Sequence, residues 1–151
     1  MADQREPGVR LVVSLYREFE QIARQGDLSL GQYRTMLYLM GGARRAGELA
    51  AANAVTKPTV SAMISGLRDQ GWVAEEVDPS DGRVTKVVLT TAGRTRLRRF
   101  EADLADRLQD LVPDVKPAEL WPTLAALYRS HATTREARLA NAFGPPPSGT
   151  A

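Results

Sequence analysis

The sequence predicts a mostly α-helical fold with one small β-hairpin. Apolar residues recur at every third or fourth position along most of the chain, which is the periodicity of amphipathic helices. Two short runs rich in β-branched residues, 72–77 and 84–90, interrupt this pattern and flank a segment with strong turn residues. A chain of 151 residues has room for one ordinary domain, or for two small units that share a core.

The composition excludes several classes of protein. With 43% hydrophobic and 25% charged residues, the chain is typical of globular proteins, and no apolar run is long enough to cross a membrane. The N-terminus lacks the apolar stretch of a secretory signal, so we expect a cytoplasmic protein without membrane contact. The lack of cysteine excludes disulfides and thiolate chemistry, and the single histidine, His131, excludes a three-histidine metal centre. We therefore expect no metal, no cofactor and no enzyme activity.

The first two helices are predicted from their apolar stripes and the residues that end them. The first covers about 7–25 and ends at the Gly-Asp pair 26–27. The second starts at Ser29, because Ser29 and Gln32 fit a capping box in which each side chain bonds the other's backbone N–H. Glycines 41–42 stop it.

A short helix over 46–53 and a longer helix over 56–70 follow, with a tight connection between them. Thr56 is a good N-cap, and Pro58 is tolerated in the first turn because its missing N–H would have no helical partner there. Gly71 is a natural terminator of the longer helix. The two strand-like runs come next, and Pro and Asp-Gly between them predict a hairpin with a protruding tip over 78–83.

Two further helices are expected after the hairpin. Thr90 or Thr91 caps a long one that runs to about residue 112, with an apolar seam of Leu97, Phe100, Leu104, Leu108 and Leu111. A proline break over 113–117 precedes a last helix that ends near residue 140, with Leu124, Leu127, Tyr128 and Leu139 as its candidate inward residues. The Pro-rich tail beyond it is expected to be disordered.

The order helix, helix, short helix, tight turn, helix, hairpin is that of a winged helix-turn-helix. We expect an N-terminal dimerisation helix over 1–28, a winged helix-turn-helix lobe over 29–90, C-terminal dimerisation helices over 91–140 and a disordered tail over 141–151. Dimerisation is expected because one small lobe cannot cover the apolar seams of all the terminal helices.

The second helix of the turn motif has an outer face of short or basic side chains, which suits the major groove of DNA. Residues 41–99 also carry 10 Lys and Arg against 6 Asp and Glu, so positive charge is concentrated there. A solvated face of a helical bundle is the alternative for this segment alone. The candidate DNA-binding residues are Thr56, Lys57, Pro58, Thr59, Ser61, Ala62, Ser65 and Arg68, with Arg44 and Arg45 as candidate phosphate contacts.

The tip of the hairpin carries Arg83, a long cationic side chain that could enter the minor groove, whose negative potential deepens as the groove narrows. Asp81 would repel phosphate, so we expect it to hold the Arg83 guanidinium in position by a charge-assisted hydrogen bond. An ordinary surface Asp–Arg pair is the alternative.

Four motifs in a fixed order carry a resemblance to a known family. They are Leu49-Ala50, Thr59-Val60-Ser61, the exit Leu67-Arg68-Asp69-Gln70-Gly71-Trp72-Val73, and Asp81-Gly82-Arg83 followed by Val88-Leu89-Thr90-Thr91-Ala92-Gly93. Over about residues 8–140 the chain resembles the MarR family of bacterial transcriptional regulators. The resemblance implies an obligate homodimer on a pseudo-palindromic operator, with recognition helices in successive major grooves and the Arg83 wings in flanking minor grooves.

The resemblance also implies a repressor that a small aromatic or amphipathic effector could release. Tyr16, Tyr33, Met36 and Met40 are candidate wall residues of the effector pocket, with ordinary core packing as the alternative. The sequence departs from the family at Ala62, where a polar or basic residue is common, at Pro58 and at Pro122, which must either start or kink the last helix. A winged-helix protein-interaction module that has lost DNA readout is the alternative function. No motif in the sequence supports a small hydrolase or isomerase.

Overall fold

The computed structural model describes residues 5–143, and the side chains of residues 5–134. The chain folds into six helices and one two-stranded antiparallel hairpin within these residues, which confirms the predicted fold class. In order, the elements are α1 (Arg5–Gln25), α2 (Leu30–Leu39), α3 (Ala46–Asn53), α4 (Lys57–Asp69), β1 (Val73–Asp78), β2 (Asp81–Leu89), α5 (Thr91–Leu111) and α6 (Pro117–Phe143).

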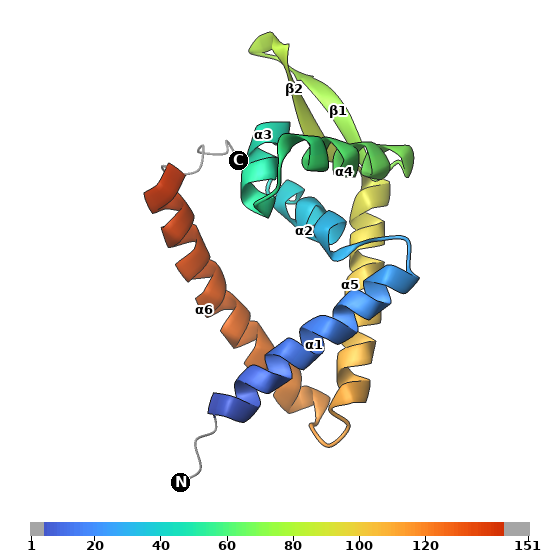
Figure 1. Cartoon of the computed structure of the whole chain (residues 1–151), viewed down its shortest axis with the longest axis vertical. Helices are drawn as coiled ribbons and strands as arrows, with labels where there is room; N and C mark the ends of the chain where they lie inside the picture. Colours follow the sequence, from blue (N-terminus) through green and yellow to red (C-terminus); the bar gives the residue numbers. More distant parts are fainter. Residues whose placement is uncertain (1–4, 144–151) are drawn as a thin grey trace. The chain divides into compact units, whose positions relative to one another are not determined.

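The chain divides after Leu108 into two compact units. The first contains α1 to β2 and most of α5, and the second contains α6. In the first unit α2, α3 and α4 pack together, and the hairpin projects beyond α4 (Figure 1). None of the helices within residues 5–143 has both the length and the apolar content needed to cross a bilayer.

The predicted caps of the central helices are confirmed. At the start of α2, the Gln32 N–H donates to Ser29 Oγ (3.2 Å) and the Ser29 N–H donates to Gln32 Oε1 (2.9 Å). At the start of α4, Thr56 Oγ1 accepts from the Thr59 N–H. Helix α3 has the predicted bounds, and α4 ends two residues before Gly71, whose φ of +72° is the conformation that favours glycine. The helix-turn-helix is therefore set by local sequence.

One apolar core holds this lobe together. Its most buried side chains come from α2, α3, α4, α5 and the α1–α2 connection, and they include Leu28, Met36, Leu39, Leu49, Val60, Leu67, Leu97 and Phe100. A buried polar link joins the first two helices of the lobe, because the Asn53 amide donates both to Thr35 Oγ1 (3.1 Å) and to the Leu49 carbonyl (2.9 Å). This link fixes α3 against α2 and so helps to orient the turn motif.

The start of α5 lies very close to the segment between α4 and β1. Thr90 caps α5, since Thr90 Oγ1 accepts from the Gly93 N–H (3.0 Å) and its hydroxyl donates to the Gly71 carbonyl (2.7 Å). A Cβ at Gly93 would lie only 2.1 Å from the Trp72 carbonyl oxygen. The glycine in the Leu-Thr-x-x-Gly motif is therefore required by close backbone approach.

The hairpin turn lies within the predicted tip but is shorter than predicted. The turn consists of Pro79 and Ser80 alone, and β2 already begins at Asp81 rather than at residue 84. The cause is Asp78, whose carboxylate accepts hydrogen bonds from the Ser80 N–H (3.0 Å) and the Ser80 hydroxyl (2.7 Å), an Asx turn that closes the chain early. Pairing runs from Val73↔Leu89 to Val77↔Thr85 and then jumps to Asp78↔Asp81, so residues 82–84 form a bulge.

The terminal helices differ from the prediction in their bounds. Helix α1 begins at Arg5 rather than near residue 7, and α6 continues to Phe143 rather than ending near 140. Pro122 lies inside α6, so it does not begin the helix. Leu127 and Tyr128, which were expected to point inward, are 62% and 70% exposed in the single chain. The side chain of Leu139 and the tail 144–151 lie outside the described residues.

Candidate nucleic-acid interface

The outer face of α4 is accessible. Val60, Ile64 and Leu67 are buried and hold the helix against the core, which turns the intervening residues outward. Lys57, Pro58, Thr59, Ser61, Ala62 and Arg68 are exposed, as is the N-cap Thr56, and Ser65 is half-buried. The predicted face therefore exists as one surface of short and basic side chains.

The N-terminal end of α4 combines several hydrogen-bonding groups. The Thr56 and Thr59 hydroxyl oxygens lie 2.8 Å apart, and no acidic residue occupies the first turn of the helix. Lys57 adds a positive charge in that turn, while the Thr59 N–H is already bonded to Thr56 Oγ1 and Pro58 has no N–H. Such a helix end attracts phosphate through its dipole, the lysine charge and the two hydroxyl groups.

At the other end of α4, Arg68 is already paired within the lobe. Its guanidinium donates to Glu75 of β1 at 2.9 Å, and both side chains remain partly exposed. The pair links the end of α4 to the hairpin, and it directs the Arg68 side chain toward β1. A phosphate would have to compete with Glu75 for this arginine.

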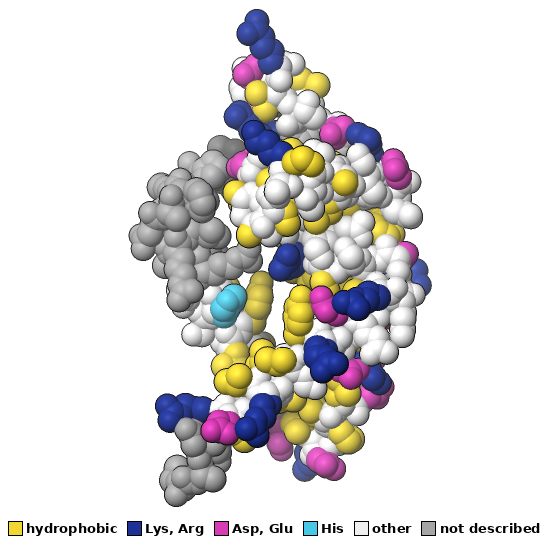
Figure 2. Space-filling view, in the orientation of Figure 1, with side chains coloured by type: hydrophobic (Ala, Val, Ile, Leu, Met, Phe, Trp, Pro, Cys, Tyr) yellow, Lys and Arg dark blue, Asp and Glu magenta, His cyan; other side chains and the backbone are white. Residues whose placement is uncertain are grey.

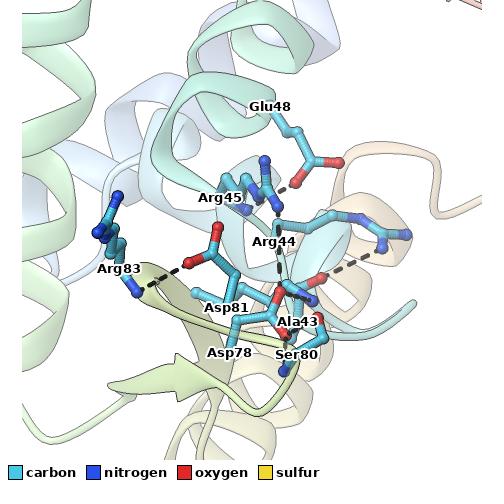
Figure 3. Close-up of polar contacts among 9 residues, drawn as sticks. Ala43, Arg44, Arg45, Glu48, Asp78, Ser80, Asp81 and Arg83 are labelled. Carbon is cyan, nitrogen blue, oxygen red and sulfur yellow. Dashed lines mark hydrogen bonds and ion pairs between the residues drawn. The ribbon is translucent and has the colours of Figure 1, made fainter.

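Arg83 lies in the bulge of β2 and is exposed. The hydrogen bond between Asp81 and Arg83 differs from the expected one, because the carboxylate accepts from the backbone N–H of Arg83 (3.1 Å) rather than from the guanidinium (Figure 3). Asp81 therefore shapes the backbone of the bulge. In the space-filling view, Lys and Arg side chains lie at the far end of the hairpin and on the lobe below it (Figure 2).

Arg44 has a structural role that the sequence analysis did not anticipate. Its backbone forms an isolated bridge with Val87 of β2 (N···O distances of 3.0 and 2.7 Å). Its guanidinium donates to the carbonyls of Ala43 and Gly41 and lies 5.1 Å from the centre of the Tyr38 ring, and its Nε is buried without a hydrogen-bond partner. Through its backbone on β2 and its half-buried side chain on the end of α2, Arg44 thus holds these two segments together.

Arg45 occupies the N-cap position of α3. Its backbone N–H donates to Glu48 Oε2 (2.7 Å), and its exposed guanidinium reaches to 4.0 Å from Asp78. Asp78 was not among the predicted site residues. It is buried and also binds Lys86 Nζ at 2.8 Å. An Asp two residues before a Ser, with Pro between them, was the sequence signal for this turn.

The four candidate effector residues do not share one environment. Met36 is fully buried in the core, and Tyr33 is half-buried, with its ring 5.2 Å from that of Phe100. Tyr16 and Met40 are about half exposed. A separate surface pocket of about 300 Å³ is lined by α1 and α5 residues, none of them among these four: Glu18, Gln21, Ile22, Gln25 and Arg107. Among the described residues, no cluster of His, Asp or Glu could hold a metal ion.

A helix-turn-helix with an open second helix, followed by an arginine-bearing hairpin, defines the class of winged helix-turn-helix proteins. Residues 26–84 match the family model described as the MarR family. Over this segment, which is less than half of the chain, the sequence is similar to the MarR family.

One curated relative is similar over a comparable length of the chain. The chain is 30% identical over 79 residues to the uncharacterized HTH-type transcriptional regulator YcgE of Bacillus subtilis (strain 168). The match covers 52% of this chain and spans about half, 51%, of that relative.

Solved structures share the fold over a longer range. MepR, a transcription regulator of the Staphylococcus aureus multidrug efflux pump MepA, is 22% identical with a TM-score of 0.65, covering 87% of this chain and 98% of that one. A MepR mutant bound to an oligodeoxyribonucleotide is 23% identical with a TM-score of 0.62, over 87% and 98% of the two chains. Wild-type MarR of E. coli in its apo form is 22% identical with a TM-score of 0.61, over 80% and 93%.

Proposed function

We propose that this protein is a sequence-specific DNA-binding transcriptional regulator that acts as a homodimer on a pseudo-palindromic operator. The observation that carries the proposal is that one compact lobe presents both an open, hydroxyl-rich face on α4 and an exposed arginine in the bulge of the adjacent hairpin. An α-helix fits the major groove, and an arginine suits a narrow minor groove.

In this proposal, the two elements have different tasks. The N-terminal turn of α4, with Thr56, Lys57 and Thr59, binds phosphate and reaches base edges, while Ser61 and Ala62 approach the bases more closely. Arg83 enters the minor groove beside it. Because Ala62 can offer only apolar contact, for example with a thymine methyl group, part of the sequence preference comes from DNA shape.

The proposed dimer is supported by exposed apolar residues on the terminal helices. On α1, Val12 is 67% exposed and lies among other exposed apolar side chains, namely Val9, Leu11, Val13 and Tyr16. On α6, Leu127 and Tyr128 are exposed. Apolar side chains of this size are removed from water only when another surface covers them. A second copy of the chain supplies such a surface, because it carries the same apolar residues. We therefore propose dimerisation through residues 1–28 and 91–140, and DNA binding through residues 29–90.

The MepR mutant bound to an oligodeoxyribonucleotide supports DNA as the partner of this fold. We further propose repression as the mode of action, relieved by a small aromatic or amphipathic effector, and the bacterial cytoplasm as the place of action. Repression follows when a dimer of this kind covers a promoter. The search for an effector site would begin with substitutions of the exposed Tyr16 and Met40.

Footprinting of purified protein on the DNA upstream of its own gene, followed by genomic selection, tests the proposal. A protected, pseudo-palindromic site with steep salt dependence is expected, because each neutralised phosphate adds about 0.9 to the slope of log K against log salt. Size-exclusion chromatography with light scattering should give twice the chain mass of 16.5 kDa. Failure to bind any duplex at low salt, with stable capture of another protein, would instead favour a protein-interaction module.

A further inference from the structure

A buried carboxylate lies where the hairpin meets the helix-turn-helix. Asp78, the last residue of β1, is only 6% exposed, although the hairpin around it projects into solvent. Aspartate is almost never buried unless it is paired. Near a surface that binds DNA, a carboxylate also repels phosphate, so its presence there calls for another reason.

The partners of Asp78 come from three parts of the lobe. The carboxylate accepts hydrogen bonds from the N–H and the hydroxyl of Ser80 in the turn (3.0 and 2.7 Å), and it binds Lys86 Nζ of β2 at 2.8 Å. Arg45 at the N-cap of α3 approaches it to 4.0 Å. In Figure 3, Asp78 and Ser80 lie together, whereas the Arg83 guanidinium points away from Asp81. Lys86 and Ser80 hold the pKa of Asp78 well below its usual range, so the carboxylate stays ionised in neutral solution.

The outer half of the hairpin needs such a contact. A two-stranded hairpin is marginally stable on its own, and residues 82–84 of this one have no cross-strand partner. The backbone bridge between Arg44 and Val87 fixes only the base of β2. Beyond that bridge, the ion pair with Arg45 connects the end of the hairpin to α3.

We propose that Asp78 is a positioning residue of the DNA-binding site. Its ion pair with Arg45 connects the outer half of the hairpin to the N-terminus of α3. Arg83 is thereby held in a fixed position relative to α4. The inference rests on the proposed function, since it assigns to Asp78 the task of placing a DNA-contacting residue. Two elements that enter neighbouring grooves must keep their spacing, and a bulge without ladder hydrogen bonds cannot keep it alone.

The variant Asp78→Asn tests this directly. Asparagine has the same shape and can still accept from Ser80, but it cannot pair with the charges of Lys86 and Arg45. The matched control is Glu76→Gln, which makes the same change in net charge on an exposed residue of the same strand. Operator affinity is measured by fluorescence anisotropy for both variants, alone and combined with Arg83→Ala, after circular dichroism has shown that each is folded.

Asp78→Asn should weaken operator binding several-fold although it removes a negative charge, whereas Glu76→Gln should bind as tightly as wild type or more tightly. In the Arg83→Ala background, Asp78→Asn should have no further effect, because it acts through Arg83. Binding of Asp78→Asn at wild-type strength or above would overturn the proposal. The proposal would also be overturned if the losses of affinity from Asp78→Asn and Arg83→Ala added in full in the double variant.

A readout without DNA separates this inference from the proposed function. Backbone amides over residues 80–86 should exchange hydrogen several-fold faster in Asp78→Asn than in wild type, and at the wild-type rate in Glu76→Gln. If the wild-type protein binds no duplex, the proposed function fails, and the exchange rates decide alone whether Asp78 anchors the hairpin. Unchanged exchange in Asp78→Asn would overturn the anchoring role, whatever the DNA result.

Discussion

Replacing Gly93 by alanine should destabilise the lobe by about 2–4 kcal/mol, the range of overpacking combined with the loss of two hydrogen bonds. The new Cβ would stand 2.1 Å from the Trp72 carbonyl oxygen and 2.8 Å from Leu89 Cδ1. Ordinary contact between a Cβ and such atoms needs more than 3.0 Å, so the start of α5 must move by roughly 1 Å. The obstacle is backbone, which cannot rotate away as a side chain would.

That movement breaks specific hydrogen bonds. The Thr90 N–H donates to the Trp72 carbonyl (3.0 Å), and the Thr90 hydroxyl donates to the Gly71 carbonyl (2.7 Å). Each is worth about 1 kcal/mol net when it is lost, and strain from incomplete relaxation adds to them. Trp72 is buried at this point, so in a Trp121→Phe background its fluorescence reports the unfolding of this region.

Urea unfolding of Gly93→Ala, followed by fluorescence and circular dichroism, measures the loss. The matched control is Gly47→Ala in α3, where a Cβ would meet nothing within 4 Å and should stabilise the helix by up to about 1 kcal/mol. If Gly93→Ala unfolds at the urea concentration of wild type, the close approach of α5 to Trp72 is refuted.

Three other outcomes are expected. Arg83→Ala should weaken operator binding several-fold in a gel shift at moderate salt, and equal binding by mutant and wild type would remove the wing from the DNA site. The pKa values of Asp27 and Asp78 are lowered in the fold, by the hydrogen bonds from Arg96 and Lys86 respectively, so their stabilisation is fully present above the unfolded-state value near 4 and is lost as the pH falls below it. Acid titration followed by circular dichroism should show this loss below about pH 4, and a flat profile down to pH 2 would contradict it. Val12→Glu places a charge on the exposed apolar face of α1 and should shift the protein toward monomer in sedimentation velocity without lowering its helix content.

Local signals in the sequence predicted the helix-turn-helix closely. Ser29 and Thr56 cap their helices as expected, and the short helix over 46–53 has the predicted bounds, because capping and apolar periodicity act within a few residues. The outward face of α4 followed from the same periodicity, since burial of Val60, Ile64 and Leu67 leaves Ser61 exposed.

The bounds of the hairpin turn were misplaced because two local turn signals compete there, whereas the packing of Arg44 was not anticipated because it depends on contacts between distant segments. Asp-Gly is a strong turn signal, yet the Asx turn at Asp78 closes the chain two residues earlier and leaves Asp81 and Arg83 in β2. The sequence offered Arg44 only as a candidate phosphate contact before the short helix. Its place over Tyr38 depends on the pairing with Val87, more than forty residues later in the chain, which no local pattern contains.

The backbone bridge between Arg44 and Val87 has a consequence for release from DNA. It joins the loop before α3 to the base of the hairpin, so the helix-turn-helix and the base of β2 move together. Under the proposed function, an effector could therefore not release the protein by detaching the base of the hairpin from the lobe. It would have to alter the distance or tilt between the two DNA-binding lobes of the proposed dimer, so that both no longer reach successive turns of the duplex together.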